Sequence, residues 1–468
     1  MKSRDSYDVI VIGAGPGGLA AAIRLTQRKK KVLLVEQDSL GGTCLNRGCI
    51  PTKSLLASAL MYKQMQHTSR LGISVSDIKP SIEQIFKRKT TIVNQLRSAL
   101  EKKLKTYGID SITGTASFSS DHAVTIKIKG EGIASYSADH FVIATGSAPR
   151  DPLKLAGISS CISTDAALDL GRIPDSILII GAGNVGIELA TFFCLLGSRV
   201  SIIEMLPSML AHADEEVVGV VYKELERMGI SMHFSSTVIG CGEAGAIVKG
   251  DDGKKFELGA DSIIWAGGRK PNIDTLDLHA AGIDHDAKGI KINEHMRTSN
   301  KSVFAIGDCT GGEYQFAYTA EAEGLAVAET IAGTAQKISY KGVPWVVYTD
   351  PEVAWVGLTE KKARETFGED SIRVGKFPFT ASGRALIEGK RKGFVKVITN
   401  LDGIVLGVHM VGAHAGELIA AAVPAVKNSL YVSDWKREDF AHPVFHEAVF
   451  MAGEDCFNMS TDLPRKQD

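Results

Sequence analysis

The chain has 468 residues, of which 44% are hydrophobic and 23% are charged, and this composition excludes a disordered chain or a fibre. Its length predicts roughly three domains of about 150 residues each. The 53 basic and 54 acidic side chains give a formal net charge of −1, which does not favour nucleic acid or an anionic membrane as a partner. No apolar stretch approaches the ~18 residues of a membrane span, and only six residues precede the apolar run at Tyr7. The sequence therefore predicts a cytoplasmic protein.

Two segments, residues 8–36 and 176–204, repeat one pattern: an apolar run, G-x-G-x-x-G, a helical segment, a second apolar run and a glutamate. The first glycine permits a tight strand-to-helix turn, the second lets a pyrophosphate approach, and the third lets helix and strand pack closely. The helix N-terminus binds the anion and the glutamate binds a ribose. Two dinucleotides in one chain imply electron transfer between them. The residues are Gly13, Gly15, Gly18 and Glu36 in the first copy, and Gly181, Gly183, Gly186 and Glu204 in the second.

Other elements can be predicted in chain order around these repeats. Apolar residues at helical spacing predict one long helix over residues 81–106. Alternating strands are predicted over residues 112–128. Residues 141–150 predict a strand that ends at a glycine turn, and residues 303–308 predict an apolar strand that ends at an acidic residue. The second repeat therefore interrupts a first domain that resumes after it. From about residue 340 the glycine fingerprint is absent, which predicts a third domain.

Of the seven cysteines, Cys44 and Cys49 form the one close pair. On an undistorted helix, Cα atoms five residues apart are separated by about 8 Å, beyond the ~7 Å limit for a disulfide. A disulfide therefore needs a distorted turn, which Gly48 and Pro51 allow, and such strained disulfides tend to be reducible. A position near a helix N-terminus also favours a thiolate at Cys49. The alternatives are two buried thiols or a metal site, although the next Cys or His is His67.

The motifs GGTCLNRGCIPTK, AIGD and AHPVFHE, together with both fingerprints, resemble the class I pyridine nucleotide–disulfide oxidoreductase family, and within it the branch that oxidises dihydrolipoamide. The resemblance covers residues 7–457. It implies an α/β fold, with two Rossmann-like domains that bind FAD and NAD and a C-terminal α+β domain that forms a homodimer. The implied domains are residues 1–150 and 271–340 for FAD, 151–270 for NAD and 341–468 for dimerisation.

The resemblance also implies roles for the reactive residues. Cys44 matches the thiol that exchanges with the substrate disulfide, and Cys49 matches the charge-transfer thiol beside the flavin. Lys53 matches the lysine near flavin N5, and Glu188 matches its ion-pair partner. No metal is implied. Further FAD contacts are expected at Gly42, Thr43, Lys53, Ala116, Thr145, Gly146, Ser147, Asp308 and Ala317, and further NAD contacts at Asn184, Val185, Val238 and Gly268.

Near the C-terminus, His442 and Glu447 match the family's His–Glu dyad, with His442 as the base. The segment departs from the usual H-P-T-x-x-E pattern, because it has Val444 and an added His446, which we interpret as a surface or interface residue. A second departure is Tyr318, where members that oxidise dihydrolipoamide usually carry a histidine. That change could alter the flavin potential or product inhibition.

Glu204 with no basic residue over residues 205–210 predicts NAD rather than NADP. Mercuric reductases carry a vicinal cysteine pair near the C-terminus, where this chain has only Cys456. The predicted reaction is therefore dihydrolipoamide and NAD⁺ giving lipoamide and NADH. The partners implied are lipoyl domains of 2-oxoacid dehydrogenase complexes, glycine-cleavage H protein, or both. The alternatives are a non-catalytic flavoprotein and a reductase of another disulfide or a quinone.

Overall fold

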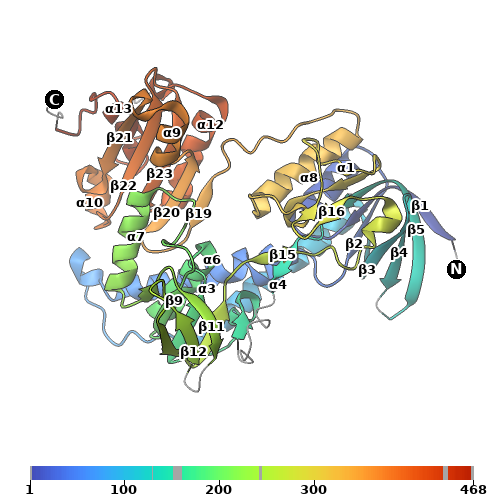
Figure 1. The fold of residues 1–468 in the computed structure, drawn as a ribbon, viewed down its shortest axis with the longest axis horizontal. Helices are drawn as coiled ribbons and strands as arrows, with labels where there is room; N and C mark the ends of the chain where they lie inside the picture. Colours follow the sequence, from blue (N-terminus) through green and yellow to red (C-terminus); the bar gives the residue numbers. More distant parts are fainter. Residues whose placement is uncertain (1–2, 129, 151–160, 242–244, 436–440, 465–468) are drawn as a thin grey trace. The chain divides into compact units, whose positions relative to one another are not determined.

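A computed structural model describes residues 3–128, 130–150, 161–241, 245–435 and 441–464 (Figure 1). The chain divides into two compact units, which are considered separately. Residues 151–160, with which the predicted second domain begins, lie outside the described residues. Within the described ranges, no helix combines the length and the apolar character that crossing a membrane requires. The first unit contains residues 1–54, 86–150 and 268–340, and the second contains residues 55–85, 151–267 and 341–468.

The first unit contains a six-stranded sheet in the order β1-β2-β3-β4-β5-β18, with an additional β1–β5 pairing. β1 runs parallel to both β2 and β5, and β18 is parallel to β5. Helix α8 packs against α1 (Figure 1). The main strands are β1 (Ser3–Ile12), β2 (Val32–Glu36), β3 (Asp110–Ser120), β4 (Ala123–Ile128), β5 (Gly132–Ile143) and β18 (Val303–Ala305). Shorter strands are β6 (Ser147–Pro149), β15 (Arg269–Pro271), β16 (His285–Asp286) and β17 (Gly289–Ile290), and the helices include α1 (Pro16–Gln27), α2 (Gly42–Arg47) and α8 (Ala317–Ile331).

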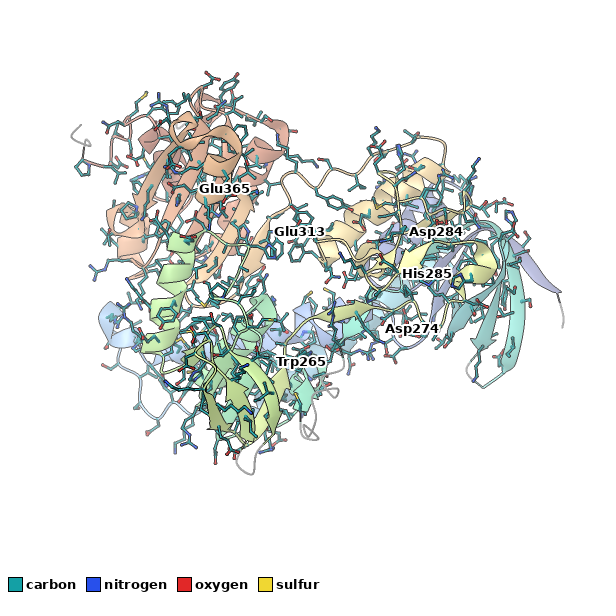
Figure 2. All side chains as sticks on the ribbon, in the orientation of Figure 1. Trp265, Asp274, Asp284, His285, Glu313 and Glu365 are labelled. Atoms are coloured by element: carbon teal, nitrogen blue, oxygen red, sulfur yellow. The ribbon has the colours of Figure 1, made fainter. Side chains whose placement is uncertain are left out.

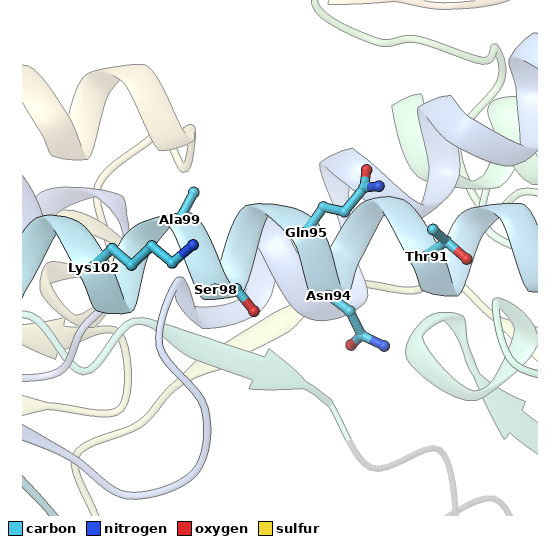
Figure 3. Close-up of a pocket in the computed structure, with 6 residues that line it drawn as sticks. All are labelled: Thr91, Asn94, Gln95, Ser98, Ala99 and Lys102. Carbon is cyan, nitrogen blue, oxygen red and sulfur yellow. The ribbon is translucent and has the colours of Figure 1, made fainter.

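Two helices continue from one unit into the other: α3 (Cys49–Met65) and α4 (Ile82–Tyr107). The long helix predicted over residues 81–106 is therefore confirmed. One face of α4 buries Phe86, Val93 and Leu104. The opposite face lines a surface hollow with small and polar side chains, shown in Figure 3. These side chains belong to Thr91, Asn94, Gln95, Ser98, Ala99 and Lys102.

The second unit contains a parallel five-stranded sheet in the order β10-β9-β8-β14-β7. A small antiparallel sheet, β11-β12-β13, shares an apolar cluster with the parallel sheet. Trp265, at the end of β14, packs against this cluster (Figure 2). The strands are β7 (Cys161–Ser163), β8 (Ser176–Ile180), β9 (Arg199–Ile203), β10 (Ser231–His233), β11 (Thr237–Cys241), β12 (Gly245–Lys249), β13 (Lys255–Gly259) and β14 (Ser262–Trp265). The helices are α5 (Thr164–Ala167), α6 (Asn184–Leu195) and α7 (Glu215–Arg227).

The C-terminal part of the second unit has an antiparallel sheet in the order β19-β20-β23-β22-β21. Helices α12 and α13 pack against it around a shared apolar core. With two β-α-β repeats and this α+β part, the predicted fold class is confirmed. The strands are β19 (Trp345–Val347), β20 (Glu352–Gly357), β21 (Ile372–Pro378), β22 (Phe394–Asn400) and β23 (Val405–Gly412). The helices are α9 (Glu360–Phe367), α10 (Gly383–Ile387), α11 (Ala415–Leu418), α12 (Ala422–Asn428) and α13 (Glu447–Asp455).

A buried lysine joins the C-terminal sheet to α7 within the second unit. Lys396 on β22 is 2% exposed, and its Nζ lies 3.0 Å from Asp214 Oδ1 and 3.0 Å from Glu216 Oε1. Glu360 Oε2 lies 2.6 Å from the same nitrogen. Asp214 also caps α7, because its carboxylate accepts the Glu216 backbone N–H. Burial works against ionisation of Glu216 and Glu360, but their cationic partners hold the pKa of both carboxyl groups below the usual range.

A Lys396→Met variant is expected to lose about 3–5 kcal/mol of unfolding free energy, because buried Asp214 then lacks its cation. Pairing with Lys396 lowers the pKa of Glu216 and Glu360. The wild-type protein should therefore have the larger unfolding free energy at pH values above the usual pKa of a glutamate, and this difference should disappear as the pH falls below that pKa. Urea unfolding measures both effects. Lys392→Met is the control, because Lys392 is exposed and its partner Glu224 keeps Arg227; it should cost at most about 1 kcal/mol. Equal losses in the two variants would contradict the prediction.

Candidate active site

The two neighbouring cysteines lie where a helical path is broken. Cys44 belongs to α2, which ends at Arg47 with Gly48 as its C-cap, and Cys49 is the first residue of α3. The distortion predicted from the sequence is thus present, and a Cβ at Gly48 would lie 3.2 Å from the Thr43 carbonyl oxygen. Both cysteines are in the thiol form and hydrogen-bond to each other. The predicted pair is therefore in contact, although its redox role stays a prediction.

The electrostatics of the pair are asymmetric. The hydrogen bond to Cys49 and burial raise the pKa of the Cys44 thiol, and negative charge on Cys49 raises it further. The positive charge of Lys53 lowers the pKa of Cys44, but this effect is smaller. Cys49 is the more exposed of the two and begins α3, where the helix dipole favours an anion. The arrangement therefore favours a proton on Cys44 and a thiolate at Cys49.

The first glycine fingerprint forms the turn between β1 and α1. Gly13 has φ +106°, and a Cβ there would lie 2.3 Å from the Ala144 carbonyl oxygen. A Cβ at Gly18 would lie 1.9 Å from the Gly13 carbonyl oxygen, so helix and turn touch without room for a side chain. Gly15 caps α1, and no side chain occupies the cap. The turn therefore fits a pyrophosphate, which needs uncapped N–H donors and close backbone approach.

The second fingerprint repeats this geometry between β8 and α6. Gly181 has φ +113°, and a Cβ at Gly186 would lie 2.0 Å from the Gly181 carbonyl oxygen. Gly183 caps α6 without a side-chain hydrogen bond, and among the described residues no atom lies within 4 Å of a Cβ built there. Asn184 and the exposed Val185 begin the helix. This turn also fits a pyrophosphate.

The two fingerprint glutamates also occupy equivalent positions. Glu36 accepts hydrogen bonds from the backbone N–H groups of Ala14 at 2.8 Å and Asp38 at 2.9 Å. Glu204 accepts them from Ala182 at 2.7 Å and Leu206 at 2.9 Å. Each carboxylate thus fastens its own turn, a role that the sequence pattern did not predict. Each oxygen retains capacity for a ribose hydroxyl, because a carboxylate accepts about four hydrogen bonds.

Residues predicted to contact FAD gather in the first unit. Ser147 Oγ donates to Asp308 Oδ2 at 2.6 Å and accepts from Arg269 Nε at 2.8 Å. Gly42 lies against the fingerprint turn, since a Cβ on it would be 2.7 Å from the Gly15 Cα. The other predicted contacts are Thr43 in α2, Lys53 in α3, Ala116 on β3, Thr145 and Gly146 after β5, and Ala317 at the start of α8.

Glu323 was not predicted from the sequence, yet it supports the same region. It is buried in α8; its Oε2 accepts the Gly307 N–H at 2.6 Å and its Oε1 accepts the Tyr340 hydroxyl at 2.7 Å. Burial raises the pKa of its carboxyl group, and the nearby charge of Asp308 adds to that increase. It therefore fixes the turn that carries Asp308. A glutamate within a helix gave no sequence signal for this contact.

Of the residues predicted to contact NAD, most lie in the second unit. Val238 is buried on β11. Gly268 has φ +105° but belongs to the first unit, so its proximity to the second fingerprint stays a prediction. Glu188, which without the resemblance would be taken for a surface acid, is buried in α6 and accepts the Tyr348 N–H at 3.1 Å. Because Lys53 belongs to the first unit, the predicted Lys53–Glu188 ion pair also stays a prediction.

The predicted His–Glu dyad is formed within the C-terminal part. Glu447 Oε1 lies 2.8 Å from His442 Nδ1, and Glu447 Oε2 accepts the Val444 N–H at 2.9 Å. The His442 side chain is 78% exposed, so its Nε2 side is accessible to another molecule. His446 is half-buried against Phe450, and burial lowers the pKa of its imidazole. The described residues contain no cluster of three or more potential metal ligands from His, Cys, Asp and Glu.

Two turns that each fit a dinucleotide, together with a pair of thiols in contact, are typical of an oxidoreductase that uses two dinucleotides and a redox-active thiol pair. Residues 7–324 match the family model of the pyridine nucleotide-disulphide oxidoreductases, and residues 343–452 match that family's dimerisation domain. The chain belongs to the pyridine nucleotide-disulphide oxidoreductase family.

Curated relatives cover nearly the whole chain. A protein named dihydrolipoyl dehydrogenase 3 from Haloarcula marismortui is 37% identical, with 96% of each chain covered. Proteins named dihydrolipoyl dehydrogenase from Bacillus subtilis and Cupriavidus necator are 37% and 38% identical; the alignments cover 94% and 97% of this chain and 97% and 99% of those proteins.

Proposed function

We propose that the chain has dihydrolipoyl dehydrogenase activity: it oxidises dihydrolipoamide to lipoamide and reduces NAD⁺ to NADH. The observation that carries the proposal is the contact between Cys44 and Cys49 in the same unit as the first fingerprint. The near full-length similarity to proteins of that name supports the choice of substrate. The contact supplies a dithiol that can exchange with a lipoyl disulfide.

FAD and NAD are the cofactors of the proposed reaction. FAD would be held by the first fingerprint, Glu36, Ser147 and Asp308, and NAD by the second fingerprint, Glu204 and Val238. The fit rests on the uncapped helix starts and on the close glycine contacts of both turns. When bound, FAD supplies two-electron transfer from the reduced thiol pair to the nicotinamide.

The chain's own residues would carry the exchange chemistry. His442, oriented by Glu447, takes a proton from one dihydrolipoamide thiol. The thiolate attacks Cys44 of the oxidised pair, so a mixed disulfide forms and Cys49 leaves as a thiolate. The second substrate thiol then attacks the mixed disulfide, which releases lipoamide and leaves Cys44 reduced. Two electrons thus pass from dihydrolipoamide to the cysteine pair.

The same proposal assigns functions to the domains. Residues 1–150 and 271–340 would bind FAD, residues 151–270 would bind NAD, and residues 341–468 would form the dimer interface. The match to a dimerisation domain over residues 343–452 supports the last of these. As partners we propose lipoyl domains of 2-oxoacid dehydrogenase complexes or of the glycine-cleavage H protein, with the cytoplasm as the compartment.

The test is NADH formation by the purified, flavin-loaded protein. Dihydrolipoamide should support rapid NADH formation, and reduced glutathione should support little. The alternative hypothesis is that the protein is a reductase of another disulfide or of a quinone. It predicts that NADH oxidation with such an acceptor exceeds turnover with lipoamide, and this result would overturn the proposal.

We expect NAD⁺ to be preferred over NADP⁺ by about a hundredfold or more in kcat/KM. Glu204 would repel a 2′-phosphate and lose its ribose partner, which together cost about 3 kcal/mol. No Lys or Arg occurs over residues 205–214 to compensate. The measurement is steady-state kinetics with each coenzyme. Glu204→Gln, which removes the charge but keeps an acceptor for a backbone N–H, should reduce the discrimination about tenfold. Equal kcat/KM values for the wild-type chain would contradict the assignment.

A further inference from the structure

The residue midway between the two cysteines makes a network of its own. Asn46 lies in α2, between Cys44 and Cys49, and is half-buried. Its Nδ2 donates to the backbone carbonyls of Leu40 at 3.0 Å and Gly42 at 2.8 Å. Both amide N–H groups therefore have acceptors inside the loop that carries the cysteines.

The amide oxygen of Asn46 receives two further hydrogen bonds from a distant part of the chain. Arg97 on α4 donates Nε at 3.1 Å and Nη2 at 2.6 Å to Asn46 Oδ1. A guanidinium makes such a paired contact with a rigid planar fork, which a lysine ammonium lacks. All four hydrogen-bonding positions of the Asn46 amide are thereby used, and α2 is fastened to α4.

This fastening matters because α2 is short and buries none of its residues. The helix has six residues, no side-chain cap at its N-terminus and no buried residue, and its C-cap is Gly48. Helices this short are not stable by themselves. Within it, Gly42 lies against Gly15 of the first fingerprint. The Asn46 side chain therefore links the cysteine loop to α4, and Gly42 brings the same loop against the fingerprint turn.

We propose that Arg97, through Asn46, is a positioning residue that holds the Cys44 and Cys49 thiols in contact. The proposal deepens the proposed function, on which it rests for its significance in catalysis. Arg97 acts through the geometry of its guanidinium group, whose two N–H donors fix the orientation of the Asn46 amide. The ionic influence on Cys44 comes from Cys49 and Lys53.

The experiment measures the equilibrium of the thiol pair with glutathione in the flavin-containing protein. The protein dithiol reacts with glutathione disulfide to give the protein disulfide and two reduced glutathione molecules, so two electrons and two protons pass to glutathione. Quenching with an alkylating reagent followed by mass spectrometry counts each form. Arg97→Met and Arg97→Lys should each lower the equilibrium constant about tenfold, equivalent to about 30 mV for a two-electron couple.

A second readout follows which thiol is alkylated at limiting reagent. In the wild-type dithiol form, the contact leaves the proton on Cys44, so iodoacetamide should modify Cys49 preferentially. Both Arg97 variants should lower the ratio of modification at Cys49 to that at Cys44 at least threefold. Lys102→Met is the matched control on the exposed face of the same helix, and it should leave both measurements unchanged. Flavin content and thermal unfolding identify any variant that has lost its fold.

Two results would overturn the proposal. The first is an equilibrium constant and an alkylation ratio within twofold of wild type in both variants. The second is wild-type behaviour in Arg97→Lys alone, which would show that the charge, and not the fork, is what matters. Neither measurement uses dihydrolipoamide or NAD, so failure of the proposed function would leave this test intact.

Discussion

A Cys44→Ser variant is expected to show long-wavelength charge-transfer absorption without any reductant, and to lose at least about a thousandfold of its lipoamide-linked activity. Cys49 begins α3, where the helix dipole favours a thiolate. In the variant no disulfide can form with residue 44, so Cys49 remains available as a donor beside the flavin. The activity falls because the substrate thiolate has no disulfide to attack. Absorption spectra and NADH formation measure the two effects.

The matched variant is Cys49→Ser. It should be equally inactive and should lack the long-wavelength absorption, because Cys44 is the thiol whose pKa is raised by burial and by its neighbour. The opposite pattern, with absorption only in Cys49→Ser, would exchange the roles of the two cysteines. A purified wild-type protein that contains no flavin would contradict the proposal altogether.

Mixing a Cys44→Ser chain with a His442→Gln chain is expected to restore activity that neither chain has alone. His442 is oriented by Glu447, and its side chain is 78% exposed on its own chain. Such exposure is expected of a base that acts in the active site of a second copy of the chain. If each site takes its thiols from one chain and its base from the other, a heterodimer has one intact site and one doubly altered site. Random exchange of equal amounts should therefore recover about a quarter of wild-type activity.

Subunit exchange must be verified independently, for example by mass spectrometry of differently tagged chains. His442→Gln alone should lose about 10²- to 10⁴-fold in kcat, the usual contribution of a general base. Glu447→Gln keeps an acceptor for His442 and should lose less. Verified exchange without recovery would place the dyad and the thiols of each site within one chain.

The elements that the sequence predicted best are those set by local pattern. The two fingerprints require φ values of +106° at Gly13 and +113° at Gly181, which glycine adopts without strain. The apolar spacing likewise located α4, observed at Ile82–Tyr107. The break at Gly48 could be predicted because the geometry of an uninterrupted helix would keep the two cysteines apart.

The supporting contacts could not be predicted, because they join residues that are far apart in the chain. Arg97 is 51 residues from Asn46, and Lys396 is 182 residues from Asp214. Neither arginine nor lysine carries a signal that distinguishes a buried partner from an exposed one. The functional groups could thus be predicted from sequence motifs, whereas the side chains that hold them in place could be identified only from the folded structure.

The two fingerprint turns differ in what lies over them, and this bears on how long each dinucleotide stays bound. Gly41 donates its N–H to the Ala14 carbonyl at 2.8 Å, and Gly42 lies against Gly15. In the second turn the Leu210 N–H donates to the equivalent Ala182 carbonyl at 3.1 Å, but among the described residues no atom lies within 4 Å of a Cβ built on Gly183. A ligand held between the Gly41–Gly42 segment and the first turn would leave only when that segment opens locally, which would make its release slow. The first dinucleotide should therefore have a residence time of many turnovers, and the second should exchange in every one.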